Sequence, residues 1–362
     1  MKISPKAKRN LNRIIPFGLI WLLSGWVFLL TEFVATRNQS GSSETEIELT
    51  LPVFIFASIA ITIIGLFVGT LEMVYLEKRF RKHSLRGKIF YKFLIYFILF
   101  LVIIAVNYPI AASLEQGVSI ISSDVWERTG KFFQSITFLN TLFQLSLSLF
   151  VSLIYAAISE NLGHQVFINF FTGKYHKPTV ETRIFMFLDM KSSTTIAESL
   201  GHVRYFKLLQ EYYDLMSDPI VSCQGEVYQY IGDEIVVSWK LEKGLANANC
   251  VNCFFEIQEQ LKDRRDYLLN EYGFEVGFKA GMHYGEVTIG EVGALKKEIV
   301  FTGDVLNTTA RIQSQCNDLN SDLLVSGKLK EALSRHSYEF NSRGAIELRG
   351  KDKKIELFSV TA

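Results

Sequence analysis

Two short acidic segments of the sequence carry residues that could bind a metal. Asp189 lies in FLDMKSSTT, at the end of an apolar run, and Asp233 lies in YIGDEIVVSW, after a glycine between two apolar runs. Each segment is typical of a strand that ends in a tight turn, so both carboxylates can reach the same point. Paired carboxylates are ligands for divalent cations such as Mg²⁺.

A third segment, GDVLNTTAR, supplies an amide and a guanidinium. Asn307 and Arg311 are four residues apart, so a helix beginning here would carry both on one face. An arginine can meet the charge that grows on a phosphoryl group during transfer, while cations neutralise the rest of the phosphate chain. The three segments together indicate in-line chemistry at a phosphorus atom.

The residues after Asp189 are polar and lead toward a helix. Backbone N–H groups at a helix start bind phosphate, so Ser193 and Thr194 are candidate phosphate contacts. The alternative is that they only cap the helix. Glu234, beside Asp233, is expected to point away from it and to be solvated, because side chains alternate along a strand.

The C-terminal half has the pattern of an α+β domain. Short apolar runs of strand length mix irregularly with longer runs of helical spacing, which favours one sheet with helices mainly on one side. The expected strands are 184–188, 226–231, 235–239, 275–283, 286–292 and 299–301, and the expected helices are 205–216, 245–271 and 305–315.

Residues 183–361 resemble the catalytic domain of class III nucleotidyl cyclases. Five motifs match in order: Phe187-x-Asp189 with Ser193-Thr194, Gly232-Asp233, GMHYGEVTIGEVG at 281–293, TGDVLNTTAR at 302–311, and RGKDKKIELF at 349–358. The resemblance implies a ferredoxin-like sheet for the α+β domain. It also implies an enzyme that converts a purine nucleoside triphosphate to its 3′,5′-cyclic monophosphate and pyrophosphate.

The resemblance assigns roles at the metal and phosphate positions. Asp189 and Asp233 match the aspartates that hold two Mg²⁺ or Mn²⁺ ions per site, and the backbone carbonyl of Met190 would complete one ion's shell. Ser193 and Thr194 match a turn that contacts phosphate. The expected cofactors are therefore two divalent cations per site.

The resemblance also gives roles to the Asn/Arg pair. Asn307 matches the residue that orients the ribose, and Arg311 matches the one that stabilises charge on the α-phosphate. Arg349 stands where relatives usually have a triphosphate-binding lysine; the two side chains are not equivalent, but both bind phosphate. In the family the aspartates come from one subunit and the Asn/Arg pair from the other. A homodimer would thus build two sites at its interface, and an isolated monomer should be inactive.

Two positions that select the purine in relatives leave the substrate open. Adenylate cyclases typically have Lys followed by Asp or Thr there, and guanylate cyclases have Glu and Cys, whereas this chain has Gln229 and Val300. Glutamine can donate or accept a hydrogen bond and valine can do neither. Adenylate cyclase, forming cyclic AMP from ATP, is the preferred reading. The alternatives are a guanylate or dual-specificity cyclase, or a catalytically silent cyclase-like regulatory domain.

The first 160 residues or so are dominated by apolar runs. Four of them, 14–35, 51–75, 89–112 and 136–158, reach the roughly 20 residues that a membrane helix needs. The expected organisation is a basic N-terminus (1–13), a four-helix transmembrane domain (14–158), a stalk or linker helix (159–180) and the cyclase domain (181–362). A transporter or channel with an attached cyclase is less favoured, because no span carries an obvious paired-charge pathway, and the acidic Glu32 and Glu72 lie near span ends.

Charge sets the expected orientation. MKISPKAKR and EKRFRKHSLRGK are basic and the first connection is mostly acidic, so both termini are expected in the cytoplasm of a multi-pass protein of the cell (inner) membrane. Asn140, Gln144 and the serines of the fourth span are expected to face other helices. A membrane lipid or an unidentified membrane ligand or partner could act through the stalk, which either pairs with its copy or is a simple tether.

The overall composition adds little. The net charge of the 362 residues is +1, and nothing indicates a nucleic-acid partner. The four cysteines lie in the C-terminal half and are expected to be reduced thiols. Cys250 and Cys253 form a CxxC inside a helical pattern and are expected to be core residues, not a metal site.

Overall fold

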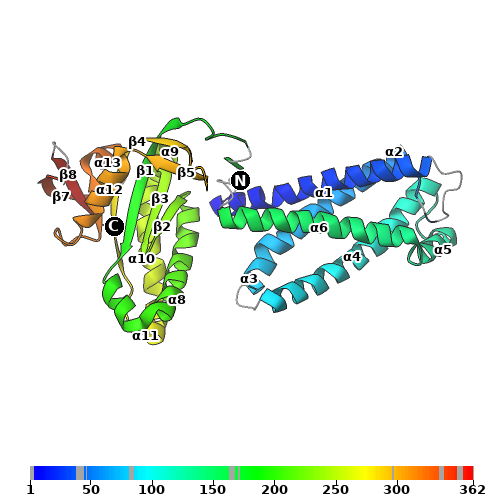
Figure 1. The fold of residues 1–362 in the computed structure, drawn as a ribbon, viewed down its shortest axis with the longest axis horizontal. Coiled ribbons are helices and arrows are strands. Elements are labelled where there is room, and N and C mark those ends of the chain that lie inside the picture. The colour runs from blue at the N-terminus through cyan, green and yellow to red at the C-terminus, as the bar shows by residue number, and fades with distance from the viewer. Residues whose placement is uncertain are drawn as a thin grey trace. The chain divides into compact units, whose positions relative to one another are not determined.

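The structure is a computed structural model that describes residues 4–37, 45, 47–80, 85–162, 168–169, 172–295, 297–333, 338–348 and 354–361. The chain divides into two compact units, Lys8–Phe167 and Ile168–Ala362, with the first seven residues grouped with the second unit. Figure 1 labels the elements of both units. Arg349 and part of the expected stalk lie outside the described residues.

The first unit is helical. Its elements are α1 (Pro5–Arg37), α2 (Leu51–Thr70), a π-helical turn η1 (Leu71–Leu76), α3 (Glu77–Phe80), α4 (Leu85–Gln116), α5 (Ser123–Phe132) and α6 (Ile136–Leu162). Four stretches of these helices, among the residues described, are long and apolar enough to cross a membrane: Pro5–Val34, Leu51–Leu76, Phe90–Gln116 and Ile136–Ser159. The prediction of four long apolar helices is confirmed.

Hydroxyl groups on α6 hold it against α1. Trp21 Nε1 donates a hydrogen bond to Ser152 Oγ at 3.0 Å, and Ser24 Oγ lies 2.8 Å from Ser148 Oγ. Both α6 serines are buried, so this face of the helix points into the unit, as the polar pattern predicted. Asn140, near the start of α6, is exposed.

Glu72 corrects the interpretation of the second span. It lies in the π-helical turn η1 and is only 5% exposed. Its carboxylate accepts hydrogen bonds from Lys92 Nζ and, at 2.6 Å, from the Tyr96 hydroxyl, both on α4. Sequence reasoning missed this ion pair because the two partners belong to different helices. A π-turn commonly marks a place where a helix is adjusted for a specific contact.

The second unit is built on one mixed sheet of eight strands. The strands are β1 (Thr179–Met190), β2 (Glu226–Ile231), β3 (Glu234–Lys240), β4 (Phe278–Val292), β5 (Glu298–Thr302), β6 (Leu323–Ser326), β7 (Glu339–Ile346) and β8 (Ile355–Thr361). They lie in the order β2-β3-β1-β4-β6-β8-β7, with β5 beside β4. The β4–β6 pair is parallel, and the neighbours on either side of β1 are antiparallel to it.

Several helices connect these strands (Figure 1). They are α8 (Ser193–Ser222), the short α9 (Leu241–Leu245) and η2 (Ala246–Ala248), α10 (Asn249–Asp263), α11 (Arg265–Tyr272), α12 (Asp304–Ser314) and α13 (Gly327–Ala332). The expected helix 245–271 is therefore interrupted. The expected strands 275–283 and 286–292 form one strand, β4, because β1 pairs with it continuously past Gly285.

The two faces of the sheet are covered differently. Ile184, Met186 and Leu188 of β1 join a large core with residues of α8, α10, α11 and α13. The alternate residues Phe185 and Phe187 point the other way and pack with Val305 of α12. Because side chains alternate along β1, Asp189 also falls on the α12 face. The α+β architecture with helices mainly on one side is confirmed.

All four cysteines are buried and form no disulfide. Cys250 and Cys253 lie on the core face of α10, and burial raises the pKa of the Cys250 thiol to about 12. They are packing residues, as the pattern indicated.

Candidate active site

Asp189 and Asp233 come together at one edge of the sheet. Asp189 is the last residue but one of β1, and Asp233 lies in the two-residue turn between β2 and β3. Gly232, the first residue of that turn, has φ +65°, a conformation that favours glycine and suits a tight hairpin. The Tyr213 hydroxyl on α8 donates a hydrogen bond to the Gly232 carbonyl at 2.7 Å and so fixes the turn.

The electrostatics of this edge are those of crowded negative charge. Burial raises the pKa of Asp189, and the adjacent Asp233 carboxylate raises it further, while Lys279 lowers it. The pKa of Tyr205 on α8 is also raised, first by burial and then by the charges of Asp233 and Asp189. The Asp233 carboxylate is thus close enough to Asp189 to oppose the ionisation of Asp189.

Glu234 belongs to the same cluster, which corrects the expectation that it is solvated. It is half-buried, and its pKa rises to about 7 because of burial and then the charges of Asp189 and Asp233. The reason is the strand register. Leu188 of β1 pairs with Ile235 of β3, so the next pair outward sets Asp189 opposite Glu234 on one face.

One oxygen of this cluster lacks a partner. Among the described residues, Asp233 Oδ2 is buried and accepts no hydrogen bond. A buried carboxylate oxygen without a donor is costly unless a cation faces it, so the site fits a hard divalent cation. The described residues contain no group of three or more His, Cys, Asp or Glu side chains arranged around one point as metal ligands. The two aspartates would therefore need backbone, water or substrate oxygens to complete a shell, as is usual for Mg²⁺. Met190, whose carbonyl is the expected third ligand, is buried at the end of β1.

Helix α12 lies directly on the sheet beside this cluster. A Cβ on Gly281 of β4 would be 2.4 Å from the backbone nitrogen of Gln313, so only glycine allows this approach. Thr308 and Thr309 face the sheet and are fully buried. Asn307 is exposed on the outer side and Arg311 is half-buried. Neither side chain forms a hydrogen bond or ion pair with another described residue, so within this chain they do not join the aspartates.

The polar turn after β1 is open at the start of α8. The N-cap is Ser192, in a left-handed conformation (φ 55°), and its side chain makes no capping hydrogen bond. Ser193 and Thr194 are the first two residues of the helix and are not its cap. Ser192 thus leaves the first N–H groups of α8 without a side-chain cap, and N–H groups at a helix start can bind an anion.

Gln229 and Val300 lie on strands that a single aromatic stack holds together. The ladder between β2 and β3 has a bulge between Val227 and Gln229, which leaves Tyr228 unpaired. The Tyr228 ring stacks on Phe301 of β5 at 4.5 Å with 2° between planes, and the Phe301 N–H donates to its hydroxyl at 3.2 Å. Gln229 is exposed and Val300 is half-buried.

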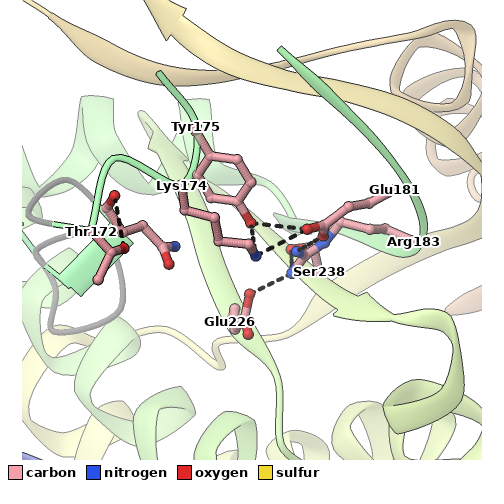
Figure 2. Close-up of polar contacts among 8 residues, drawn as sticks. Thr172, Lys174, Tyr175, Glu181, Arg183, Glu226 and Ser238 are labelled. Atoms are coloured by element: carbon pink, nitrogen blue, oxygen red, sulfur yellow. Dashed lines mark hydrogen bonds and ion pairs between the residues drawn. The ribbon is translucent and has the colours of Figure 1, made fainter. Parts of the chain in front are cut away.

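A buried arginine supports this stack. The Arg183 guanidinium is 5.1 Å from the centre of the Phe301 ring. It donates to Glu181 at 3.0 Å, to Glu226, and to Ser238 Oγ at 3.2 Å, and it is 1% exposed. Figure 2 shows that the Tyr175 hydroxyl and Lys174 Nζ, from the segment before β1, reach the same Glu181 carboxylate, each at 3.1 Å. The network fixes the strands that carry the two base-selecting candidates.

Sequence reasoning missed two neighbours of Asp189. Lys279 of β4 and Gln313 of α12 both contact its Oδ2, at 3.4 and 3.2 Å. Lys279 is the β4 partner of Asp189 in the sheet register, which strand pairing alone could have revealed. Gln313 lies two residues after Arg311, and no pattern in the sequence predicted that its side chain contacts β1.

The chain belongs to the family described as the adenylate and guanylate cyclase catalytic domain. The family model matches residues 175–362, more than half of the chain. The match covers the whole sheet and the acidic edge, with α8 and α12. The class III resemblance is thereby confirmed.

Similar proteins carry cyclase names. The chain is 34% identical over 206 residues to "Adenylate cyclase 2" of Rhizobium meliloti, covering 57% of each chain. It is 26% identical over 180 residues to "Adenylate cyclase 1" of the same organism, covering 48% of this chain and 27% of that one. The chain thus spans 57% of the length of the first relative and 27% of the second. The solved structure of a bacterial light-regulated adenylyl cyclase matches 60% of this chain and 63% of that chain, with a TM-score of 0.52 and 22% identity, which shows a shared fold.

Proposed function

We propose that this protein is a membrane-anchored adenylate cyclase that forms 3′,5′-cyclic AMP and pyrophosphate from ATP. The observation that carries the proposal is the acidic edge, where Asp189 and Asp233 meet and one buried oxygen of Asp233 has no partner. The similarity to relatives named adenylate cyclase favours ATP over GTP.

The proposal assigns separate roles to the chain's metal-binding and phosphate-binding residues. Asp189, Asp233 and the Met190 carbonyl would hold two Mg²⁺ or Mn²⁺ ions, which would activate the ribose 3′-hydroxyl and neutralise the triphosphate. The exposed start of α8, with Ser193 and Thr194, would contact phosphate. Arg349 would bind the triphosphate, although it lies outside the described residues.

Asn307 and Arg311 would act across a dimer interface. Asn307 would orient the ribose, and Arg311 would face the charge that develops at the α-phosphorus. Asn307 is exposed, and neither side chain forms a hydrogen bond or ion pair with another described residue of its own chain, which is compatible with a role in the site of a second copy. Two copies in a symmetric pair would build two equivalent sites.

The first unit would anchor the enzyme. Its four long apolar helices support a multi-pass protein, and the basic residues around the second connection support cytoplasmic termini in the cell membrane. The proposed boundaries are 1–13, 14–158, 159–180 and 181–362. A lipid or another membrane ligand would act on the cyclase unit through residues 159–180.

Complementation between two inactive variants tests the shared site. Asp233→Ala and Arg311→Ala should each abolish cyclase activity when purified alone. The two variants are co-expressed with different affinity tags and purified through both tags. The mixed dimer should recover one of its two sites, because that site takes Asp189 and Asp233 from one subunit and Asn307 and Arg311 from the other, all unchanged. A mixed dimer that stays inactive while wild-type protein turns over would contradict the shared site. Inactivity of the wild type itself would favour the silent regulatory reading.

A further inference from the structure

The Asp189 carboxylate is contacted by two donors that differ in charge. Gln313 Nε2, a neutral amide, lies 3.2 Å from Oδ2, and Lys279 Nζ, an ammonium, lies 3.4 Å from the same oxygen. They come from separate elements, α12 and β4. Two donors from different elements thus contact the same oxygen, Asp189 Oδ2.

Both donors are held in place by the fold. Gln313 is 7% exposed, and the absent side chain of Gly281 lets its backbone sit on β4. Lys279 pairs with Asp189 in the β1–β4 ladder, and only 15% of its side chain is exposed. Its ammonium also lies 3.4 Å from Asn317 Oδ1, just beyond α12. These contacts are therefore not those of mobile surface side chains.

The two donors have opposite consequences for a cation at this edge. A neutral amide fixes the carboxylate's orientation and leaves its charge available to a metal; losing such a contact commonly weakens metal binding about 10–100-fold. A lysine ammonium a few ångströms away repels a divalent cation and competes with it for the same oxygen.

We propose that Gln313 and Lys279 are positioning residues of opposite sign, Gln313 orienting Asp189 for a divalent cation and Lys279 limiting how tightly that cation binds. The inference rests on the proposed function in taking Asp189 as a metal ligand. Without a metal, the Lys279 ammonium pairs with the Asp189 carboxylate. A cation that binds Asp189 must displace the ammonium from the shared oxygen. A moderate metal affinity follows, so that full binding would await the substrate's phosphates.

Binding of Mn²⁺ alone tests the inference without any turnover. The full-length protein in detergent at pH 8 is titrated with Mn²⁺, and free Mn²⁺ is measured by electron paramagnetic resonance. Lys279→Met should tighten binding about tenfold, and Gln313→Met should weaken it about tenfold. Lys279→Arg, which keeps the charge, should bind as the wild type does. Methionine replaces both residues with an unbranched chain, and equal unfolding temperatures would show that the fold is intact.

The outcomes separate this inference from the proposed function. If Asp233→Ala binds Mn²⁺ as tightly as the wild type does, the proposed metal site is wrong, and so is the inference. If Asp233→Ala loses Mn²⁺ binding while Lys279→Met binds Mn²⁺ more weakly than the wild type or equally well, only the inference is overturned. Tighter binding by Lys279→Met cannot come from general damage, because damage to the fold lowers the affinity. Opposite shifts in the two methionine variants would support it. If Gln313→Met lowers the unfolding temperature, Gln313→Leu, which is also uncharged and has no donor, replaces it and must bind Mn²⁺ more weakly than the wild type, since otherwise the orienting role is refuted.

Discussion

The two units each contain carboxylates that are wholly or partly buried, the single Glu72 in the helical unit and a cluster of three in the cyclase unit, and these charges are neutralised differently. In the helical unit, Glu72 has one ammonium, Lys92, and one hydroxyl, Tyr96, so its charge is balanced within the protein. In the cyclase unit, the carboxylates of Asp189, Asp233 and Glu234 lie close together, and among the described residues the ion pair found in this cluster is that of Lys279 with Asp189. The first of these is complete as a structural contact. The second leaves negative charge and an unpartnered oxygen, which are what a bound cation would neutralise.

The largest effect is expected at the unbalanced cluster. Asp233→Ala should lower cyclase turnover by at least about 10³-fold, because it removes a proposed metal ligand whose charge stabilisation is worth several kcal/mol. The folded state should persist, since the residue lies in a turn. Product formation is measured by chromatography with saturating ATP and Mn²⁺. Turnover within tenfold of wild type would show that this carboxylate is not needed.

Substitutions in the balanced Glu72–Lys92 pair should change the stability of the helical unit. Lys92→Met leaves Glu72 buried without its cation and should destabilise the helical unit by about 3–5 kcal/mol. The double variant Glu72→Leu, Lys92→Met should regain most of this loss, because no buried charge is left over. Thermal unfolding in detergent, followed by tryptophan fluorescence, measures both. A double variant no more stable than Lys92→Met would show that the pair is not a self-contained contact.

Glu234 should make the stability of the cyclase unit depend on pH. In EDTA, the raised pKa of Glu234, about 7, means that the folded protein binds this proton more tightly than the unfolded chain does. Stability of the cyclase unit should therefore fall as pH rises from about 4.5 to 7, the range between the usual glutamate pKa and this value. Burial and the two aspartate charges cause the shift, so Glu234→Gln should flatten the decline.

Unfolding temperatures between pH 5 and 8, with and without Mn²⁺, provide the check. Mn²⁺ should reduce the decline, because a bound cation offsets the carboxylate repulsion. A cyclase unit that gains stability across this range in EDTA would contradict the description of the cluster.

The smallest effect is expected at the turn that carries Asp233. Tyr213→Phe removes the hydrogen bond to the Gly232 carbonyl and should cost about 1 kcal/mol. Tyr267→Phe, which loses only a long, exposed contact of 3.4 Å from its hydroxyl to Glu211, is the control and should change stability much less. Equal chemical denaturation midpoints for both variants would mean that the tyrosine does not hold the turn.

Much of this architecture could be predicted from the sequence because local patterns specify it. The hairpin around Gly232 and Asp233 needs only two apolar runs and a glycine, and the four long helices need only apolar length. The pattern also predicted a helix at 305–315, which the structure has as α12. The fold class followed from these local signals.

The contacts that were missed all depend on pairing between distant segments. Glu234 was expected in solvent because alternation along β3 was judged without the register to β1. Lys92 meets Glu72 only after two helices pack, and Gln313 meets Asp189 only because Gly281 admits α12. No single segment carries the information for such contacts.

The most direct test of the central claim is turnover by the wild-type protein. Purified full-length dimer is assayed with ATP and GTP in parallel, each with Mg²⁺, with Mn²⁺ and with excess EDTA. The account predicts cyclic AMP from ATP with either metal, a smaller yield from GTP, and no product in EDTA. Cyclic product that persists undiminished in EDTA, or no product from either nucleotide, would contradict it.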